Sequence, residues 1–356
     1  MFLVSWIHFV NTGTYVQEVP GVINGILPQP LFPKSLHNLT APEVFLWQNF
    51  NIEFPTLGVI LFFLISGYFL PSLQEKSLKK NTPLLVSRMT TFYPTMFLCV
   101  AAVGVLVWLT QGITYSLLDY FATATATQLF LPVPDLTIGP LWYMVALFFP
   151  YLICTIVPRL SLSNLPAIYL CLALLVVLPA CGIDVYLPFY GYLRKIAHVA
   201  RYATIPLLGS AMALCHRYQE KIPKLYCVPI FGFFFGMTMT ILNLAQELYG
   251  DVGTYSEANN FFAAFLIISI MWALDKLAGK SIERISPLLV WVKRISFAFY
   301  IIHLPFGFLT IYYLRNNGIS IGLSLLAAYV VSILVAVVIS LIVEKFTAYV
   351  KAQTIP

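Results

Sequence analysis

The sequence predicts an all-α fold, a polytopic membrane protein whose helices form a bundle in the bilayer. Of its 356 residues, 60% are hydrophobic and only 10% are charged. A soluble domain typically has about 45–50% apolar and about 25% charged residues. The mean hydropathy is +0.86. With so little charge to cover a water-facing surface, the chain is not expected to be a cytosolic enzyme, a secreted disulfide scaffold or a disordered regulator.

Ten apolar runs approach the roughly 20 residues that a helix needs to cross the hydrocarbon core. We expect about 10 transmembrane helices, near residues 1–17, 55–73, 90–111, 140–157, 165–182, 198–215, 225–246, 258–275, 295–314 and 319–343. The stretch 112–139 contains Tyr115, Tyr120 and Pro132 among small and polar residues. It is predicted to be an interfacial or re-entrant segment instead of an eleventh span.

The distribution of basic residues predicts the orientation, because cytoplasmic loops carry an excess of Lys and Arg. With alternating spans and a cytoplasmic N-terminus, fifteen of the twenty basic residues fall on the cytoplasmic side and five on the outer side. Both termini are therefore expected in the cytoplasm, with the protein in the cell (plasma or inner) membrane. No repeat or long soluble appendage interrupts the chain, so residues 1–356 are predicted to form one membrane domain.

The net charge of +6 is modest, and the basic residues do not gather as they would in a nucleic-acid-binding surface. The bilayer is thus the expected partner and nucleic acid is not. The six cysteines lie in or beside apolar runs without a C-x-x-C pair. They are expected to be small buried residues, and no metal site is predicted. No feature of the sequence indicates an oligomeric state.

The first span carries a polar stripe. Ser5, His8, Thr12 and Tyr15 recur at helical spacing, and Asn11 lies one turn from His8. Ionisable residues in a span are costly and usually mark a site. An imidazole has a near-neutral pKa, which suits a general base. His8 is either such a base or a packing residue that hydrogen-bonds to a neighbouring helix.

Two further polar sets share helix faces. Ser296, Tyr300 and His303 occur at i, i+4 and i+7 in the ninth span, where a Tyr–His pair between helices is the alternative to a functional role. The second set lies toward the outer ends of spans seven and eight. It either holds a hydroxylated substrate or is an ordinary water-exposed helix end, and it comprises Thr240, Asn243, Glu247, Asn259 and Asn260.

Basic residues form two more groups. Arg194, His198 and Arg201 precede span six on the predicted outer side. They either meet an anionic group such as a lipid phosphate or, as we expect, lie flat in the headgroup layer. On the cytoplasmic side, a second group either attracts a phosphate-bearing donor or only reflects the topology. It comprises Lys76, Lys79, Lys80 and Arg88.

Five segments, in order along almost the whole chain, resemble the acyltransferase type 3 family. They are WIHFVNTG, VILFFLISGYFL, SRMTTFYP, GPLWYMVALFFPYL and ISFAFYIIHLPF. The resemblance implies an integral membrane protein that transfers an acyl group, most often acetyl, to sugars of surface polysaccharides or their precursors. It also implies acyl-CoA as a co-substrate used from the cytoplasm, with no bound cofactor.

Several residues match the family's motifs by position. His8 matches the first-span histidine, the family's catalytic candidate, and Arg88 matches the first arginine of R-x-x-R-I-x-P. Other matches are Ser66-Gly67-Tyr68 with the SGF/SGY turn, Trp142 with the fourth-span tryptophan, and His303 with the late Y-x-x-H.

Two positions depart from the family's pattern. An arginine upstream of the histidine would precede Met1, so we expect a start codon set too far downstream, the alternative being a truncated first helix. Thr91 replaces the second arginine of the R-x-x-R element, which weakens any donor-phosphate grip there.

The hypothesis that follows is acyl transfer from a thioester to a sugar hydroxyl, with His8 as the general base. Arg88, Trp142 and Tyr143 are candidates for donor binding or for stabilising the oxyanion. The supporting polar face is Asn11, Ser66, Tyr300 and His303, and the acceptor-side candidates are Asn243, Glu247, Asn259 and Asn260. The alternatives are a transporter or flippase for a lipid-linked sugar and an inactive structural subunit of a polysaccharide synthesis complex.

Overall fold

The structure is a computed structural model of the chain. It describes residues 9, 41–50, 52, 54–79, 84–127, 141–157, 159–180, 196–197, 199–217, 224–249, 257–278 and 280–354. Within these residues every regular element is helical and no strand occurs. The predicted all-α class is confirmed to that extent.

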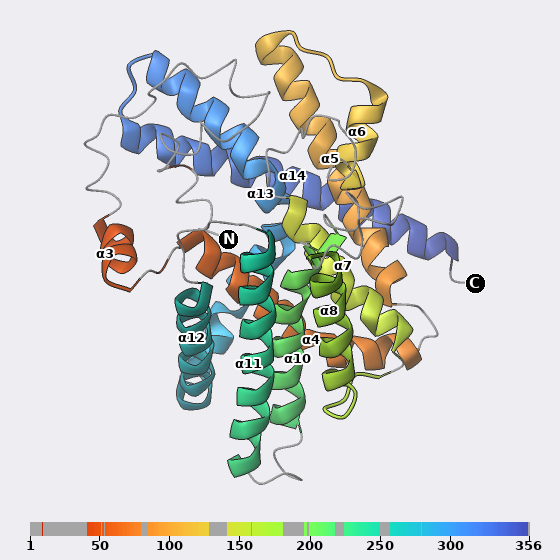
Figure 1. Cartoon of the computed structure of the whole chain (residues 1–356). Coiled ribbons are helices and arrows are strands. Elements are labelled where there is room, and N and C mark those ends of the chain that lie inside the picture. The colour runs from red at the N-terminus through yellow and green to blue at the C-terminus, as the bar shows by residue number, and fades with distance from the viewer. Residues whose placement is uncertain are drawn as a thin grey trace. The chain divides into compact units, whose positions relative to one another are not determined.

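The helices follow one another along the chain in the order that Figure 1 shows. They are α3 (Ala41–Phe50), α4 (Phe54–Lys79), α5 (Leu84–Gln111), α6 (Leu117–Ala124), α7 (Leu141–Ile156), α8 (Leu165–Ala180), the 3-10 turn η4 (Arg201–Ala203), α10 (Thr204–Arg217), α11 (Lys224–Tyr249), α12 (Glu257–Ala278), α13 (Lys280–Asn316) and α14 (Ile321–Thr354). Prolines lie inside many of them, as membrane helices tolerate.

Five of these helices are long and apolar enough to cross a membrane. Their apolar segments are Thr56–Gln74, Met89–Thr110, Tyr226–Ala245, Val290–Asn316 and Ile321–Tyr349, which correspond to five of the ten predicted spans. Shorter apolar helices cover Ala146–Ile156, Leu165–Pro179 and Asn259–Ile270, inside three other predicted spans. The first predicted span lies outside the described residues, apart from Phe9. The full count and the orientation remain predictions.

The chain divides into two compact units. The first comprises Met1–Phe50, Met89–Leu141 and Leu266–Pro356, and the second comprises Asn51–Arg88 and Trp142–Phe265.

In the first unit, α14 packs against α13 along a row of small residues. The row repeats every four residues, so its members share one helix face, and all of them are buried: Ser324, Ala328, Ser332, Ala336 and Ser340. Small side chains let two membrane helices approach closely, which increases their dispersion contacts. At one end of this pair, the Arg294 guanidinium donates two hydrogen bonds to the Glu344 carboxylate.

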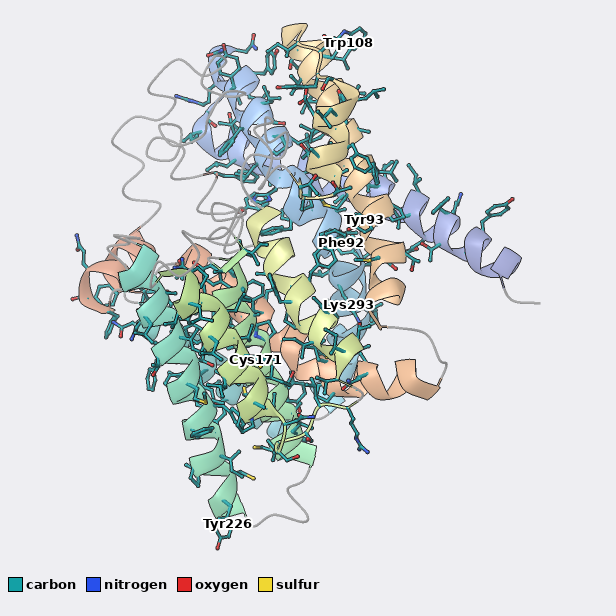
Figure 2. All side chains as sticks on the ribbon, turned by 45° about the vertical axis from the view of Figure 1, so that its right-hand side comes forward. Phe92, Tyr93, Trp108, Cys171, Tyr226 and Lys293 are labelled. Atoms are coloured by element: carbon teal, nitrogen blue, oxygen red, sulfur yellow. The ribbon has the colours of Figure 1, made fainter. Side chains whose placement is uncertain are left out.

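Helix α5 also packs against α13. The rings of Phe92 and Phe297 stack with centroids 5.0 Å apart, and the Tyr313 hydroxyl lies 3.5 Å from the Thr110 carbonyl oxygen. Trp108 lies at the opposite end of α5 from Phe92 (Figure 2). Contacts at both ends therefore hold α5 alongside α13.

A short helix, α6, folds back on the end of α5. Ser116 begins it with a capping box in which Asp119 takes part. Its eight residues are too few to cross the bilayer. Tyr120 fits against Gly104, where an added Cβ would lie 2.1 Å from the tyrosine oxygen. The segment 112–127 therefore contains no eleventh span.

In the second unit, α4 and α10 approach so closely that glycine is required at their contact. A Cβ on Gly67 would lie 1.8 Å from the Pro206 carbonyl oxygen, and one on Gly209 would lie 2.1 Å from that of Leu64. The Ser210 hydroxyl donates to the Gly67 carbonyl oxygen at 2.9 Å. Helices α8, α10 and α11 run side by side (Figure 1).

A buried tyrosine joins these three helices. The Tyr169 hydroxyl on α8 donates to the Thr204 carbonyl oxygen at 3.0 Å and lies 3.0 Å from the Thr238 hydroxyl of α11. Because a phenol carries one proton, Thr238 is the donor in the second bond. One side chain thus satisfies polar groups from two neighbouring helices.

Candidate functional site

The predicted base, His8, and its neighbour Asn11 lie outside the described residues, but the residue next to His8 is described. Phe9 is helical and fully buried. Its ring lies 4.9 Å from that of Tyr329 on α14 and 6.4 Å from that of Phe308 on α13, both edge-on. Such aromatic pairs contribute about 0.5–1.5 kcal/mol beyond their buried area. Phe9 therefore anchors the chain beside His8 to the α13–α14 pair.

The third aromatic neighbour of Phe9 is His303, at 6.0 Å between ring centroids. The structure thus brings Phe9, the sequence neighbour of His8, together with the late-span His303. Both residues belong to the first unit. Sequence spacing within either helix does not predict this proximity.

His303 is almost completely buried on α13, with 1% of its surface exposed. Its Nδ1 lies 2.7 Å from the Tyr300 carbonyl oxygen, and its ring stacks on Phe299 at 5.8 Å and 18°. A carbonyl oxygen only accepts, so Nδ1 carries the proton. In the neutral ring, Nε2 is then the nitrogen with the lone pair.

The predicted Tyr–His pair takes a different form in the structure. Tyr300 and His303 lie on one helix with ring centroids 5.7 Å apart, and the hydrogen bond of His303 Nδ1 is to the backbone carbonyl of Tyr300. The Ser296 hydroxyl donates to the Lys293 carbonyl oxygen at 2.9 Å. Ser296 is only half-buried, so it lies at the edge of the buried cluster.

The donor-side candidates lie on two helices. Arg88 is in the first turns of α5, and Trp142 and Tyr143 are in the first turn of α7. The structure describes the backbone of these three residues but not their side chains. Their proposed roles remain predictions.

The Ser66-Gly67-Tyr68 motif lies in the middle of α4, so the expectation that it forms a turn is wrong. The reason is the close contact with α10, which needs a glycine inside a continuous helix. Ser66 is half-buried, and the Tyr68 ring lies 6.4 Å from that of His216 on α10. In the described structure this motif serves helix packing.

The acceptor-side candidates divide by burial. Asn260 on α12 is fully buried, whereas Asn259 and Asn243 are exposed. The side chain of Glu247 is outside the description. Of these three asparagines, only Asn260 lies in the protein interior.

Three buried polar residues of the second unit differ from the expectations that the sequence raised. Arg201 was expected elsewhere, and Gln74 and Tyr169 were not singled out. Arg201 is 3% exposed, and its Nη2 donates to the Tyr202 hydroxyl at 2.7 Å. A buried guanidinium does not fit the expectation that this residue lies in the headgroup layer. Gln74 and Tyr169 are also buried and hydrogen-bonded. A lone glutamine or tyrosine in an apolar run was the available signal.

Metal ligands and disulfides are the remaining chemistry that the His, Cys, Asp and Glu side chains could provide. In the described part of the chain, no three His, Cys, Asp or Glu side chains gather as metal ligands would. The five described cysteines are free; Cys99, Cys154 and Cys215 are buried, and Cys171 is exposed on α8 (Figure 2).

A family model described as an acyltransferase domain matches residues 1–345. No curated protein and no solved structure matches the chain. The matched range includes His8, Phe9, His303 and the motifs that carry the resemblance.

Proposed function

Since this chain belongs to the acyltransferase 3 family and is a membrane-embedded acyltransferase, we propose that it moves an acetyl group from acetyl-CoA to a sugar hydroxyl. The acceptor is a cell-surface polysaccharide or its lipid-linked precursor. The observation that carries the proposal is the family match across residues 1–345, which includes His8 on the polar face of the first predicted span.

In the proposed reaction the sugar oxygen attacks the thioester carbonyl carbon. A new C–O ester bond forms, the C–S bond breaks, and the CoA thiolate leaves. A sugar hydroxyl is a weak nucleophile near neutral pH, so a positioned base must accept its proton as the attack proceeds. His8 accepts that proton, and the imidazolium then returns it to the departing thiolate.

The negative charge that develops on the thioester oxygen requires hydrogen-bond donors. Arg88, Trp142 and Tyr143 are the proposed donors, and Arg88 also suits the phosphates of CoA. Removing one donor of this kind typically costs about 2.7–4 kcal/mol of transition-state stabilisation. The acceptor-side candidates are Asn243, Glu247, Asn259 and Asn260, whose amide and carboxylate groups can form hydrogen bonds with a sugar hydroxyl.

The test is complementation of a deletion strain. Mass spectrometry of its surface glycans compares the wild-type gene, His8→Ala, and His216→Ala as an exposed histidine control. We expect acetyl groups to return with the wild type and with His216→Ala, and to be absent with His8→Ala at equal protein level. Unchanged acetylation with His8→Ala would contradict the proposed mechanism.

A further inference from the structure

A notch in α13 receives the side chain of Phe9. The notch is at Gly307, which lies one helical turn beyond His303. A Cβ added there would lie 2.1 Å from Cε1 and 2.4 Å from Cζ of the Phe9 ring. Carbon atoms in van der Waals contact lie about 3.5–4.0 Å apart. No residue other than glycine fits at position 307 unless the ring moves.

The Phe9 ring has little room to move. It is fully buried, and Tyr329, His303 and Phe308 lie around it at ring distances of 4.9, 6.0 and 6.4 Å. A packed interior accepts added volume only through off-rotamer side chains or a shift of the backbone. A larger residue at position 307 would therefore push the Phe9 backbone away from α13.

The backbone of Phe9 is joined directly to that of His8. Consecutive Cα atoms are about 3.8 Å apart, so a shift at one is transmitted to the other. We propose that Gly307 is a positioning residue: by admitting the Phe9 ring, it sets where the His8 imidazole stands relative to the reacting hydroxyl. The inference rests on the proposed function, since it gives the notch a role in placing the base.

The expected kinetic consequence is specific. A misplacement of about 1 Å in a catalytic group can lower the rate about 100-fold. The proposed donor-binding residues are Arg88, Trp142 and Tyr143 on α5 and α7, and His8 is not one of them. A shift of His8 should therefore reduce kcat and leave the KM for acetyl-CoA nearly unchanged.

The experiment compares four variants in membranes supplied with radiolabelled acetyl-CoA. They are Gly307→Ala, Phe9→Leu, the double variant, and Gly322→Ala on α14, where an added Cβ meets nothing within 4 Å. We expect Gly307→Ala to lower kcat about 10- to 100-fold. The double variant should recover much of that loss, because leucine lacks the ring atoms that the new methyl group meets. Gly322→Ala should match the wild type.

A second readout does not depend on activity. In a His8→Cys background, the rate at which a small maleimide labels residue 8 is measured by mass spectrometry. Gly307→Ala should change that rate at least twofold, and Phe9→Leu added to it should restore the original rate. If Gly307→Ala does not accumulate, Phe9→Leu alone is compared, and it should alter the labelling rate without loss of protein.

The two readouts separate the two ideas. If the labelling rate of residue 8 changes as expected but the wild-type protein transfers no acetyl group, the positioning of residue 8 by Gly307 stands and the proposed function is wrong. The positioning role would be wrong if the wild-type protein is active and Gly307→Ala has the same kcat and the same labelling rate as Gly322→Ala. A double variant no better than Gly307→Ala would also overturn it.

Discussion

The side-chain oxygen of Gln74 accepts a hydrogen bond of 2.7 Å from the backbone N–H of Leu160. The amide nitrogen of the same side chain donates to the carbonyl oxygens of Cys154, at 3.0 Å, and Val157. Cys154 lies in the last turn of α7 and Val157 directly follows this helix, where backbone carbonyl groups have no partner within the helix. One buried glutamine on α4 thus caps a helix that carries two of the proposed donor residues.

Replacing this glutamine should destabilise the second unit. Gln74→Leu leaves an N–H and two carbonyl groups unpaired, at about 1–3 kcal/mol for each buried group that finds no other partner. We expect a lower unfolding temperature in detergent, measured by differential scanning fluorimetry. Gln48→Leu, at an exposed position on α3, is the control. Equal unfolding temperatures for the two variants would show that the cap contributes nothing.

The glycine contact between α4 and α10 gives a second prediction. Gly67→Ala places a methyl group 1.8 Å from a backbone oxygen of Pro206, which no side-chain rotation relieves. Overpacking costs about 1–3 kcal/mol and occasionally more, so we expect less folded protein by size-exclusion chromatography. Gly236→Ala on α11 meets nothing within 4 Å and should behave as the wild type. A normal yield from Gly67→Ala would mean that α4 and α10 are not this close.

How much of the fold can be predicted from the sequence depends on the kind of contact that determines each part. Composition and the lengths of apolar runs predicted the helical class, because crossing a bilayer constrains both. The same signals placed the long apolar helices close to where they occur, such as α14 against the predicted 319–343. The Ser66-Gly67-Tyr68 motif was misread as a turn because a glycine that permits helix contact looks the same in sequence as one that bends the chain.

Contacts between helices were not predictable from one sequence. Phe9 looked like an ordinary apolar residue beside a histidine, and Gly307 like a glycine in a membrane span. Their complementarity depends on the register of two segments almost three hundred residues apart in the chain. Arg201 was misplaced for the same reason, since helical spacing gives the face of a helix and not what covers it.

Helix α6 is expected to lie in the interface between lipid and water on the outer side of the cell membrane. Its exposed side is apolar, with Leu117, Leu118 and Phe121 all more than half exposed, and Tyr120 contacts α5 at Gly104. Gly104 is six residues from the end of the Met89–Thr110 span, a depth of about 9 Å. Interfacial helices insert about 5–10 Å. Burial, and then Tyr120 and Asp119, raise the pKa of Tyr115 beside this helix above its ordinary value.

Depth measurements test this position. A spin label at Leu118→Cys should be reached by oxygen more readily than by a water-soluble nickel reagent, whereas one at Asn317→Cys, in an exposed loop, should favour the nickel reagent. A label at 118 that behaves like the one at 317 would place α6 in water.

The buried tyrosine of α8 gives a fourth prediction. Tyr169→Phe removes a hydroxyl that pairs with Thr204 and Thr238, and leaves a buried carbonyl oxygen without that donor. We expect a loss of about 1–3 kcal/mol in the free energy of unfolding. Tyr226→Phe, at an exposed tyrosine on α11 (Figure 2), should cost nothing measurable. Chemical denaturation followed by intrinsic fluorescence compares them.

Acyl transfer with His8 as the base is the reaction that we propose for this protein. The most direct measurement incubates membranes containing the wild-type protein or His8→Ala with radiolabelled acetyl-CoA and counts label in the purified glycan. We expect labelled glycan only with the wild type. Unmodified glycan that crosses the membrane without gaining label, or equal labelling by His8→Ala, would contradict it.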